Sequence, residues 1–479
     1  MRSILCAAAV VAASASDGRR HLTPVLQSGG DVRKAAKVGP LPGINATSYA
    51  GFFEVNATAH AEHFFWHWPA LSGNASAPVV VWLQGGPGSS SLFGMWVESG
   101  PFSLDAALNP HWRSTTWASD YNMVYLDNPR ETGYSYADAG ALCTDWQCYA
   151  ADFDAWLAQF IVAFGFQKND VYITGESYGG HYVPAAAFAV MQNNAAGRQP
   201  TINLAGVAIG NGFVAPYEMQ AGYPEIIFNA GLISLENLAV ALNYSARITE
   251  ALDGDDYVGA YLIWDAFLNG DSTPGGAWFT NVTGLTNYFN VATETPPEFG
   301  FFVSYVTSPA VRTAIGVGNA KYNDGNLAVE LALVGDVMFS QKPRVEALLQ
   351  GARKCGASCA GPRVRDLVRA AAAAAAPQRA LTSSLARPPA RPQLARRCSS
   401  TTARWTSFAA RRSRSATCRC SSGRGRPPGR RRRARCGTTR ATRAAPLPAT
   451  SEARPTSCRS LFAALGIWRR RTSHLARWT

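Results

Sequence analysis

Short apolar runs alternate with longer amphipathic segments through the first half of the chain. Runs typical of buried strands lie at 77–83, 123–126, 171–174 and 204–209. Between the second and third runs, Tyr149 to Phe164 carries apolar residues at helical spacing, and the Ala-rich stretch from His181 to Gln192 follows the third. Strands that alternate with helices predict an α/β fold, in which a mostly parallel sheet has helices on both faces.

The alternation stops after Gly212. Residues from about 213 to 305 show patterns of short helices and loops, and they are rich in Tyr, Trp and Phe. The pattern recovers between Tyr305 and Leu349, where Ser308 to Ala314 has the signals of a helix start. We therefore expect one large domain at 16–350, with an insertion at 213–305.

The composition changes sharply near residue 352. Residues 352–479 contain 29 Arg and 1 Lys but only 2 acidic residues, whereas the rest of the chain contains 15 basic and 30 acidic residues. This C-terminal part includes the Ala run at 370–376 and the Arg run at 430–433, and it has few apolar residues at helix or strand spacing. We expect 351–479 to be a disordered tail, and the acidic net charge to belong to the domain.

The start of the chain has the features of a secretory signal peptide at 1–15. Arg2 supplies the positive end, Ile4 to Ala13 an apolar core, and Ala13-Ser14-Ala15 a small-residue cleavage site. The core is too short to span a bilayer, and no later run is long enough, so we expect no membrane span. Five Asn-x-Ser/Thr sequons support export and are candidate glycosylation sites: Asn45, Asn56, Asn74, Asn243 and Asn281.

Cys143 and Cys148 form a close pair in a stretch with loop character. In an oxidising compartment such a pair forms a disulfide. Metal binding is the weaker interpretation, because no histidine or second cysteine pair accompanies these two residues, and we predict no metal site.

The candidate chemistry centres on Gly175-Glu176-Ser177-Tyr178-Gly179, which lies between a predicted strand and a predicted helix. A Gly-x-Ser-x-Gly sequence in this context indicates a nucleophile elbow, a sharp turn that presents the serine hydroxyl above the sheet. The two glycines would allow the sharp turn, and the N–H of Tyr178 would point to where an oxyanion forms. We therefore predict Ser177 as a nucleophile.

A second glycine-rich stretch follows the first predicted strand. Gln84-Gly85-Gly86-Pro87-Gly88-Ser89-Ser90-Ser91 occupies the position at which an α/β-hydrolase carries its other oxyanion donor. We predict that Gly86 supplies this second N–H group.

These stretches carry a family resemblance. Trp82 to Ser90, Glu98-Ser99-Gly100-Pro101, Asp127-Asn128-Pro129, Gly175 to Pro184 and Gly210-Asn211-Gly212 resemble, in order and spacing, the motifs of serine carboxypeptidases. With Gln84 and the Ser48 to Phe53 stretch, the chain looks most similar to the vitellogenic-like branch. The resemblance covers about residues 40–350. It implies an α/β-hydrolase fold whose insertion at 213–305 is a helical cap over the active site, which would exclude water.

The resemblance also implies an activity and a set of binding residues. The activity would be removal of C-terminal residues from peptides through an acyl-enzyme on Ser177, without a cofactor, in the secretory pathway, outside the cell or in a vacuole or lysosome. Gln84, Gly85, Glu98 and Glu176 would bind the terminal carboxylate of the substrate. Two carboxyl groups held close together cannot both ionise easily, so at least one should stay protonated at mildly acidic pH and donate a hydrogen bond.

Two features depart from the family pattern. Arg130-Glu131 follows Asn128-Pro129, where family members usually carry a small apolar residue and Gly; the pair either alters this loop or reflects a local error in the sequence. The catalytic histidine should follow Ser177, but only His181 and His474 do so, and neither has the family context. His181 is one helical turn beyond Ser177, and we interpret it as structural. No matching Asp motif follows Leu349 either, so the chain as written should be nearly inactive.

Two hypotheses for the tail follow from its composition. It is either a true basic tail that binds nucleic acid or an anionic surface, or the out-of-frame translation of a GC-rich gene. We favour the second, because out-of-frame GC-rich codons encode Arg, Ala, Pro, Ser and Cys, and we therefore expect no nucleic-acid partner. For the whole protein, two alternatives to a carboxypeptidase stay open: an acyltransferase on the same scaffold, and a secreted binding protein that has lost catalysis.

Overall fold

The computed structural model describes residues 17–354. The predicted signal peptide at 1–15 and residues 355–479 of the predicted tail lie outside the described residues. The first four residues of that predicted tail, 351–354, instead belong to the helix Lys342–Lys354. Within the described residues, no helix is long and apolar enough to cross a membrane.

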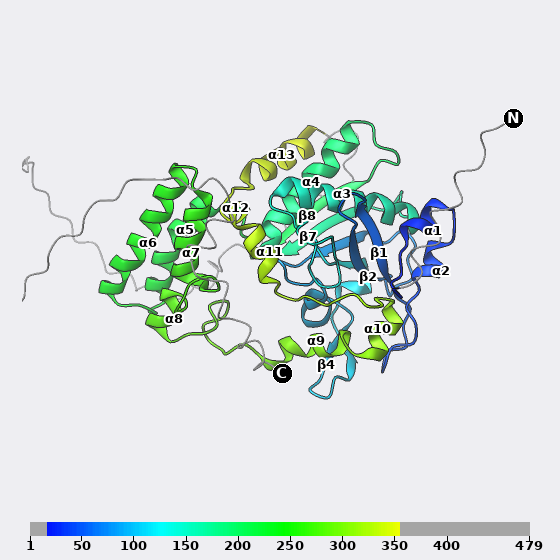
Figure 1. The fold of residues 1–479 in the computed structure, drawn as a ribbon, viewed down its shortest axis with the longest axis horizontal. Coiled ribbons are helices and arrows are strands. Elements are labelled where there is room, and N and C mark those ends of the chain that lie inside the picture. Colours follow the sequence, from blue (N-terminus) through cyan, green and yellow to red (C-terminus); the bar gives the residue numbers. More distant parts are fainter. Residues whose placement is uncertain (1–16, 355–479) are drawn as a thin grey trace, which may run out of the picture. The chain divides into compact units, whose positions relative to one another are not determined.

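A six-stranded sheet forms the centre of the domain, in the order β1-β2-β6-β3-β7-β8. Figure 1 labels β1, β2, β7 and β8 of this sheet. Strands β6, β3, β7 and β8 run parallel to one another. Strand β2 pairs antiparallel with β6 on one side and with β1 on the other. The strands are β1 (Tyr49–Asn56), β2 (Ala61–Trp68), β3 (Val79–Leu83), β6 (Asn122–Leu126), β7 (Val171–Glu176) and β8 (Leu204–Gly210).

Both faces of the sheet are buried in separate apolar cores. Val79, Val81 and Leu83 of β3 belong to the core that contains helices α3 and α4, whereas Val80 and Trp82 belong to the core that contains α9 and α10. This confirms the predicted α/β arrangement, since a parallel strand that is apolar on both faces must be covered on both.

The remaining body elements connect and cover these strands. They are α1 (Thr23–Gln27), α2 (Val32–Ala36), the π-helix η1 (Gly94–Glu98), a hairpin of β4 (Phe102–Leu104) and β5 (Pro110–Trp112), η2 (Trp117–Ser119), α3 (Trp146–Ala163), α4 (Gly179–Ala195), α9 (Phe301–Val306), α10 (Pro309–Ile315), α11 (Leu327–Ala332), α12 (Val334–Val337) and α13 (Lys342–Lys354).

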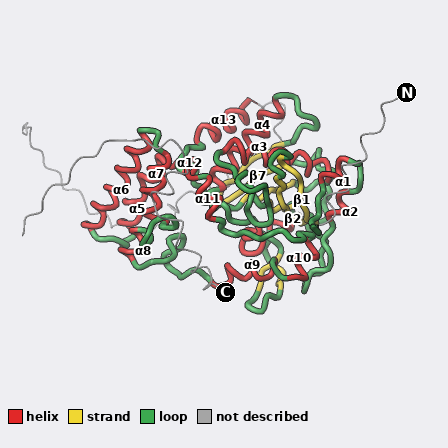
Figure 2. Tube along the Cα trace, in the orientation of Figure 1, coloured by secondary structure: helices red, strands yellow, loops and turns green. Residues whose placement is uncertain are grey.

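The segment after β8 contains helices and loops without strands (Figure 2), as the sequence predicts for 213–305. Two of its helices, α5 and α6, are longer than the short helices expected, because their apolar faces pack against each other and α6 also packs against α7. The elements are α5 (Pro216–Asn229), α6 (Leu235–Asp253), α7 (Tyr257–Trp264), η3 (Asp265–Asn269), α8 (Trp278–Thr283) and η4 (Pro297–Gly300).

Strand β8 forms one edge of the described sheet. Its sequence, Leu-Ala-Gly-Val-Ala-Ile-Gly, contains no charged residue, and Val207 is 38% exposed. A parallel strand with this composition is normally covered on both faces and paired on both edges. Among the described residues, β8 therefore has no neighbouring strand on one side, although its composition is typical of a strand inside a sheet.

Candidate active site

Ser177 occupies the tip of a sharp turn between β7 and α4. Its φ of 58° lies in the left-handed region, which non-glycine residues rarely adopt. The turn is fixed by its backbone: Ser177 N donates to Gly210 O at 3.0 Å, and Ser177 O accepts from Gly180 N and Phe213 N, both at 2.9 Å. The Gly210-Asn211-Gly212 motif at the end of β8 thus supports the elbow.

The glycines of the elbow serve close packing. The strained φ belongs to Ser177, whereas a Cβ on Gly175 would lie 2.5 Å from Leu83 O and one on Gly179 would lie 3.0 Å from the same oxygen. As predicted, neither position has room for a side chain, and the two glycines let the elbow lie directly against the end of β3.

The glycine-rich loop lies against the elbow, as predicted. A Cβ on Gly85 would be 2.5 Å from Tyr178 N and 2.8 Å from Ser177 Cβ, so only glycine fits there. Gly86 is exposed, with a φ of 108°. Within the described residues, neither Gly86 N nor Tyr178 N donates to a backbone acceptor. An oxyanion hole needs N–H donors of this kind near its nucleophile, and the assignment of Gly86 and Tyr178 to it stays a prediction.

Next to this site lie the three side chains predicted to recognise a carboxylate. Gln84 Nε2 donates to Glu176 Oε2 at 3.0 Å, and Trp82 Nε1 donates to Gln84 Oε1 at 2.8 Å. Because an indole N–H can only donate, it fixes the amide so that its NH2 group faces Glu176. Glu98, at the end of η1, is partly buried, and its Oε2 has no hydrogen-bond partner among the described residues.

Burial, followed by the contact with Glu176, raises the pKa of Glu98 to about 9. Gln84 and Arg113 oppose this increase only in part. Glu98 is thus protonated at neutral pH and can donate a hydrogen bond to an anion. This agrees with the prediction that at least one of the two carboxyl groups stays protonated at mildly acidic pH.

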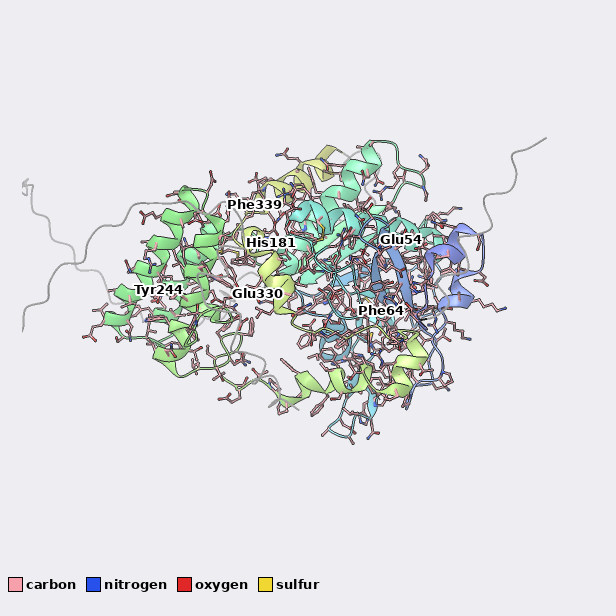
Figure 3. The ribbon with its side chains drawn as sticks, in the orientation of Figure 1. Glu54, Phe64, His181, Tyr244, Glu330 and Phe339 are labelled. Atoms are coloured by element: carbon pink, nitrogen blue, oxygen red, sulfur yellow. A yellow bond between two sulfur atoms is a disulfide. The ribbon has the colours of Figure 1, made fainter. Side chains whose placement is uncertain are left out.

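A buried carboxylate lies behind the elbow and was not identified from the sequence. Asp336, 3% exposed, accepts hydrogen bonds from Tyr178 Oη at 2.8 Å, Tyr149 Oη at 3.0 Å and Trp146 N at 3.1 Å. Its carboxylate lies 3.5 Å from Nδ1 of His181, whose ring stacks on Tyr178. Figure 3 labels His181. His181 therefore packs behind the nucleophile, in agreement with its structural interpretation.

Each of the other described histidines has its contacts away from Ser177. His21 contacts Glu62, His60 contacts Asp138, His63 lies 3.9 Å from Asp152, His67 contacts Met123 O, and His111 contacts Asp105. Burial lowers the pKa values of His63 and His67 to about 4, so both are neutral and inside the body. Among residues 17–354, no histidine is placed as a base for Ser177.

The unusual Arg130-Glu131 pair has definite structural partners. Arg130 is 7% exposed and forms a two-pronged ion pair with Asp152, at 2.6 and 2.9 Å, and donates to Ala141 O. Glu131 adopts a φ of 64°, where glycine is normally favoured, and its carboxylate accepts from Ala137 N at 3.2 Å. Both residues therefore have partners within the folded body, and Glu131 occupies a backbone conformation that normally favours glycine.

Cys143 and Cys148 are joined by a disulfide, as predicted. Asp152 lies close to both sulfurs, but bonded sulfurs are not metal ligands. Four of the five sequon asparagines are exposed, and Asn56 is half-buried.

The sequence model of the family described as "Serine carboxypeptidase" matches residues 40–355. The chain belongs to the serine carboxypeptidase family. It is 39% identical over 327 residues to the human "Probable serine carboxypeptidase CPVL", a match that covers 67% of this chain and 68% of the relative. It is 34% identical over 336 residues to the vitellogenic carboxypeptidase of Aedes aegypti, covering 68% and 70%.

A solved structure shows the same fold. The prohormone-processing carboxypeptidase Kex1 of Saccharomyces cerevisiae aligns with a TM-score of 0.57 at 21% identity, over 67% of this chain and 76% of that one. The α/β-hydrolase fold of this serine carboxypeptidase family member is thereby established, and the residues beyond 355 lie outside the family match.

Proposed function

We propose that this serine carboxypeptidase acts through Ser177 on the last peptide bond of its substrates. Ser177 Oγ would bond to the carbonyl carbon, and its proton would pass through a base to the leaving amino acid as the C–N bond breaks. Water would then hydrolyse the acyl-enzyme. The observation that carries this proposal is the convergence of a strained Ser177 with the free N–H groups of Gly86 and Tyr178.

Exopeptidase specificity would come from the adjoining carboxyl cluster. A protonated Glu98, the NH2 group of Gln84 and the N–H of Gly85 are donors suited to one carboxylate, and Glu176 fixes the orientation of Gln84. Because these groups lie beside the oxyanion donors, they would place the terminal residue of a peptide next to the nucleophile. Peptide or protein C-termini are therefore the proposed substrates.

The base must come from outside the described residues. We attribute its absence to a reading-frame change near codons 345–360, where the composition changes and where the family match ends. In the restored frame, the missing Asp and His would follow, with strands that cover the free edge of β8. The chain as written is expected to hydrolyse peptides very slowly.

The signal-like start, the five sequons and the Cys143–Cys148 disulfide support a protein of the secretory pathway, outside the cell or in a vacuole or lysosome. A fluorophosphonate probe tests the catalytic proposal on the protein purified from its own cells. We expect the probe on Ser177, located by tandem mass spectrometry, and release of single C-terminal residues from peptides. Absence of labelling in that natural protein would favour the non-catalytic binding protein, and acyl transfer from activated esters without peptide hydrolysis would favour the acyltransferase.

A further inference from the structure

The loop from Gln84 to Ser91 is held only in part by its own hydrogen bonds, from Ser89 N to Gly85 O at 3.2 Å and from Gln84 N to Ser91 Oγ at 3.0 Å. Gly86 and Gly88 both have positive φ values, of 108° and 96°, and glycines are the most flexible residues in an unfolded chain. The loop must nevertheless hold the backbone of Gly85 and Gly86 against the elbow. Its conformation therefore depends on contacts with neighbouring segments.

The first of these contacts is Asp127, directly after β6, the parallel neighbour of β3. Asp127 Oδ1 accepts from Ser90 Oγ at 2.6 Å and from Ser91 N at 3.1 Å. Its Oδ2 accepts from Tyr134 N at 2.9 Å. Both oxygens of this fully buried carboxylate are thus occupied, and two of its three donors belong to the glycine-rich loop.

The second contact comes from the segment before α11. Asp324 Oδ1 accepts from Ser90 N at 3.0 Å, and Asn326 N donates to Gly88 O at 3.2 Å. Ser90 is therefore held between two carboxylates, one on its hydroxyl and one on its amide. Ser91 passes this restraint to the binding site, because its Oγ accepts from Gln84 N at 3.0 Å.

We propose that Asp127 is a positioning residue of the active site, which fixes the loop bearing Gln84, Gly85 and Gly86 through Ser90 and Ser91, with Asp324 restraining the opposite side of Ser90. This inference rests on the proposed function for the roles of Gln84, Gly85 and Gly86, but the anchoring itself does not.

The charge environment supports a dedicated role. No Lys or Arg in the described residues forms an ion pair with Asp127, so its burial is not compensated by a cation. Burial raises the pKa of Asp127 to about 7, and the charge of Asp324 also raises it, whereas the donors Ser90, Tyr134 and Ser91 oppose the change. Asp127 also packs directly against Gly133, since a Cβ on Gly133 would lie 2.0 Å from its Oδ2.

The test is made on the full chain in the Ser177→Ala background, which prevents turnover. Asp127→Asn keeps the shape of the side chain but replaces one acceptor oxygen with an NH2 group. Because both oxygens of Asp127 accept hydrogen bonds, this NH2 group must face another donor and one side of the contact is lost. Ser90→Ala is a milder variant that removes the hydroxyl, which donates to Asp127 and accepts from Leu92 N at 3.2 Å. Asp138→Asn, at an exposed carboxylate, is the matched control, and Phe53→Leu in β1 controls for lost stability.

Two readouts separate anchoring from general destabilisation. Amide hydrogen exchange of the 84–92 segment should become about tenfold faster in Asp127→Asn. The Kd for N-benzyloxycarbonyl-Phe-Leu should weaken about tenfold, since the loop holds its carboxylate donors. Ser90→Ala should show both effects more weakly, and the two controls should show neither.

Unchanged exchange in Asp127→Asn would overturn the proposal. So would faster exchange with an unchanged Kd, because Asp127 would then hold the loop without serving the site. An equal loss of affinity in Phe53→Leu would also overturn it. If the starting protein binds neither this ligand nor other N-blocked dipeptide acids, the proposed function fails instead, and the exchange data alone decide whether Asp127 anchors the loop.

Discussion

Recognition of the terminal carboxylate should depend on a single proton on Glu98. The pKa of Glu98 is raised to about 9, so the group is neutral through the acidic and neutral range and ionises only above it. The protonated form donates a hydrogen bond to the ligand, whereas the ionised form repels it. Affinity should therefore be constant from about pH 5 to 8 and fall about tenfold by pH 10, as the protonated fraction falls.

The perturbation is Glu98→Gln, which supplies an N–H donor at every pH. In the Ser177→Ala background, we expect this variant to bind N-benzyloxycarbonyl-Phe-Leu within about threefold of the parent at pH 7 and to lose the decline above pH 8. Glu98→Ala lacks the donor and should bind about tenfold or more weakly, the usual cost of a hydrogen bond to a charged group. Glu236→Gln, at an exposed carboxylate in α6, is the control and should behave like the parent.

Isothermal titration calorimetry in buffers of different ionisation enthalpy measures the proton directly. At pH 9.5, a group with a pKa of about 9 is about three-quarters ionised, so binding should take up about three-quarters of a proton. Glu98→Gln should take up none, and the dipeptide amide should bind weakly at every pH. Proton uptake that persists in Glu98→Gln, or a parent affinity that does not change between pH 8 and 10, would refute the reasoning.

Three further predictions concern the body of the protein. Asp152→Ala should lower the free energy of unfolding by about 3–5 kcal/mol in urea titrations, because it leaves the Arg130 guanidinium buried and unpaired; a loss below about 1 kcal/mol would contradict the ion-pair account. Replacing both Cys143 and Cys148 with Ser should lower the free energy of unfolding by only about 2 kcal/mol, because the disulfide closes a short loop. A double variant that does not fold would show that the disulfide contributes more than this. Val207→Lys should reduce self-association of the chain as written, measured by sedimentation velocity, because Lys on an apolar edge strand opposes pairing; unchanged association would place the contact elsewhere.

The sequence predicts the parts of the site whose chemistry lies in continuous motifs. The elbow around Ser177 and the loop around Gly85 are of this kind, since both depend on local glycine patterns and on the strands before them. Asp127 and Asp336 could not be assigned in this way. Their partners Ser90 and Tyr178 are 37 and 158 residues away along the chain, so only the folded structure brings them together.

The sheet shows the same division. The parallel strands β3 and β7 were predictable from short apolar runs, but β1 and β2 were not. β2 (Ala61–Trp68) is buried at seven of its eight positions and includes His63 and His67, so it lacks the alternation that marks a half-exposed strand. The size of the increase in the pKa of Glu98 could not be predicted from the sequence either, because burial is its largest cause.

A full-length cDNA read across codons 345–360 decides most directly whether the protein has a catalytic base. We expect a shift of one or two bases that restores a downstream Asp and a Gly-x-Gly-His-like segment, which would complete the triad of Ser177. A confirmed frame would contradict this, and the chain would then be a carboxypeptidase scaffold without its base.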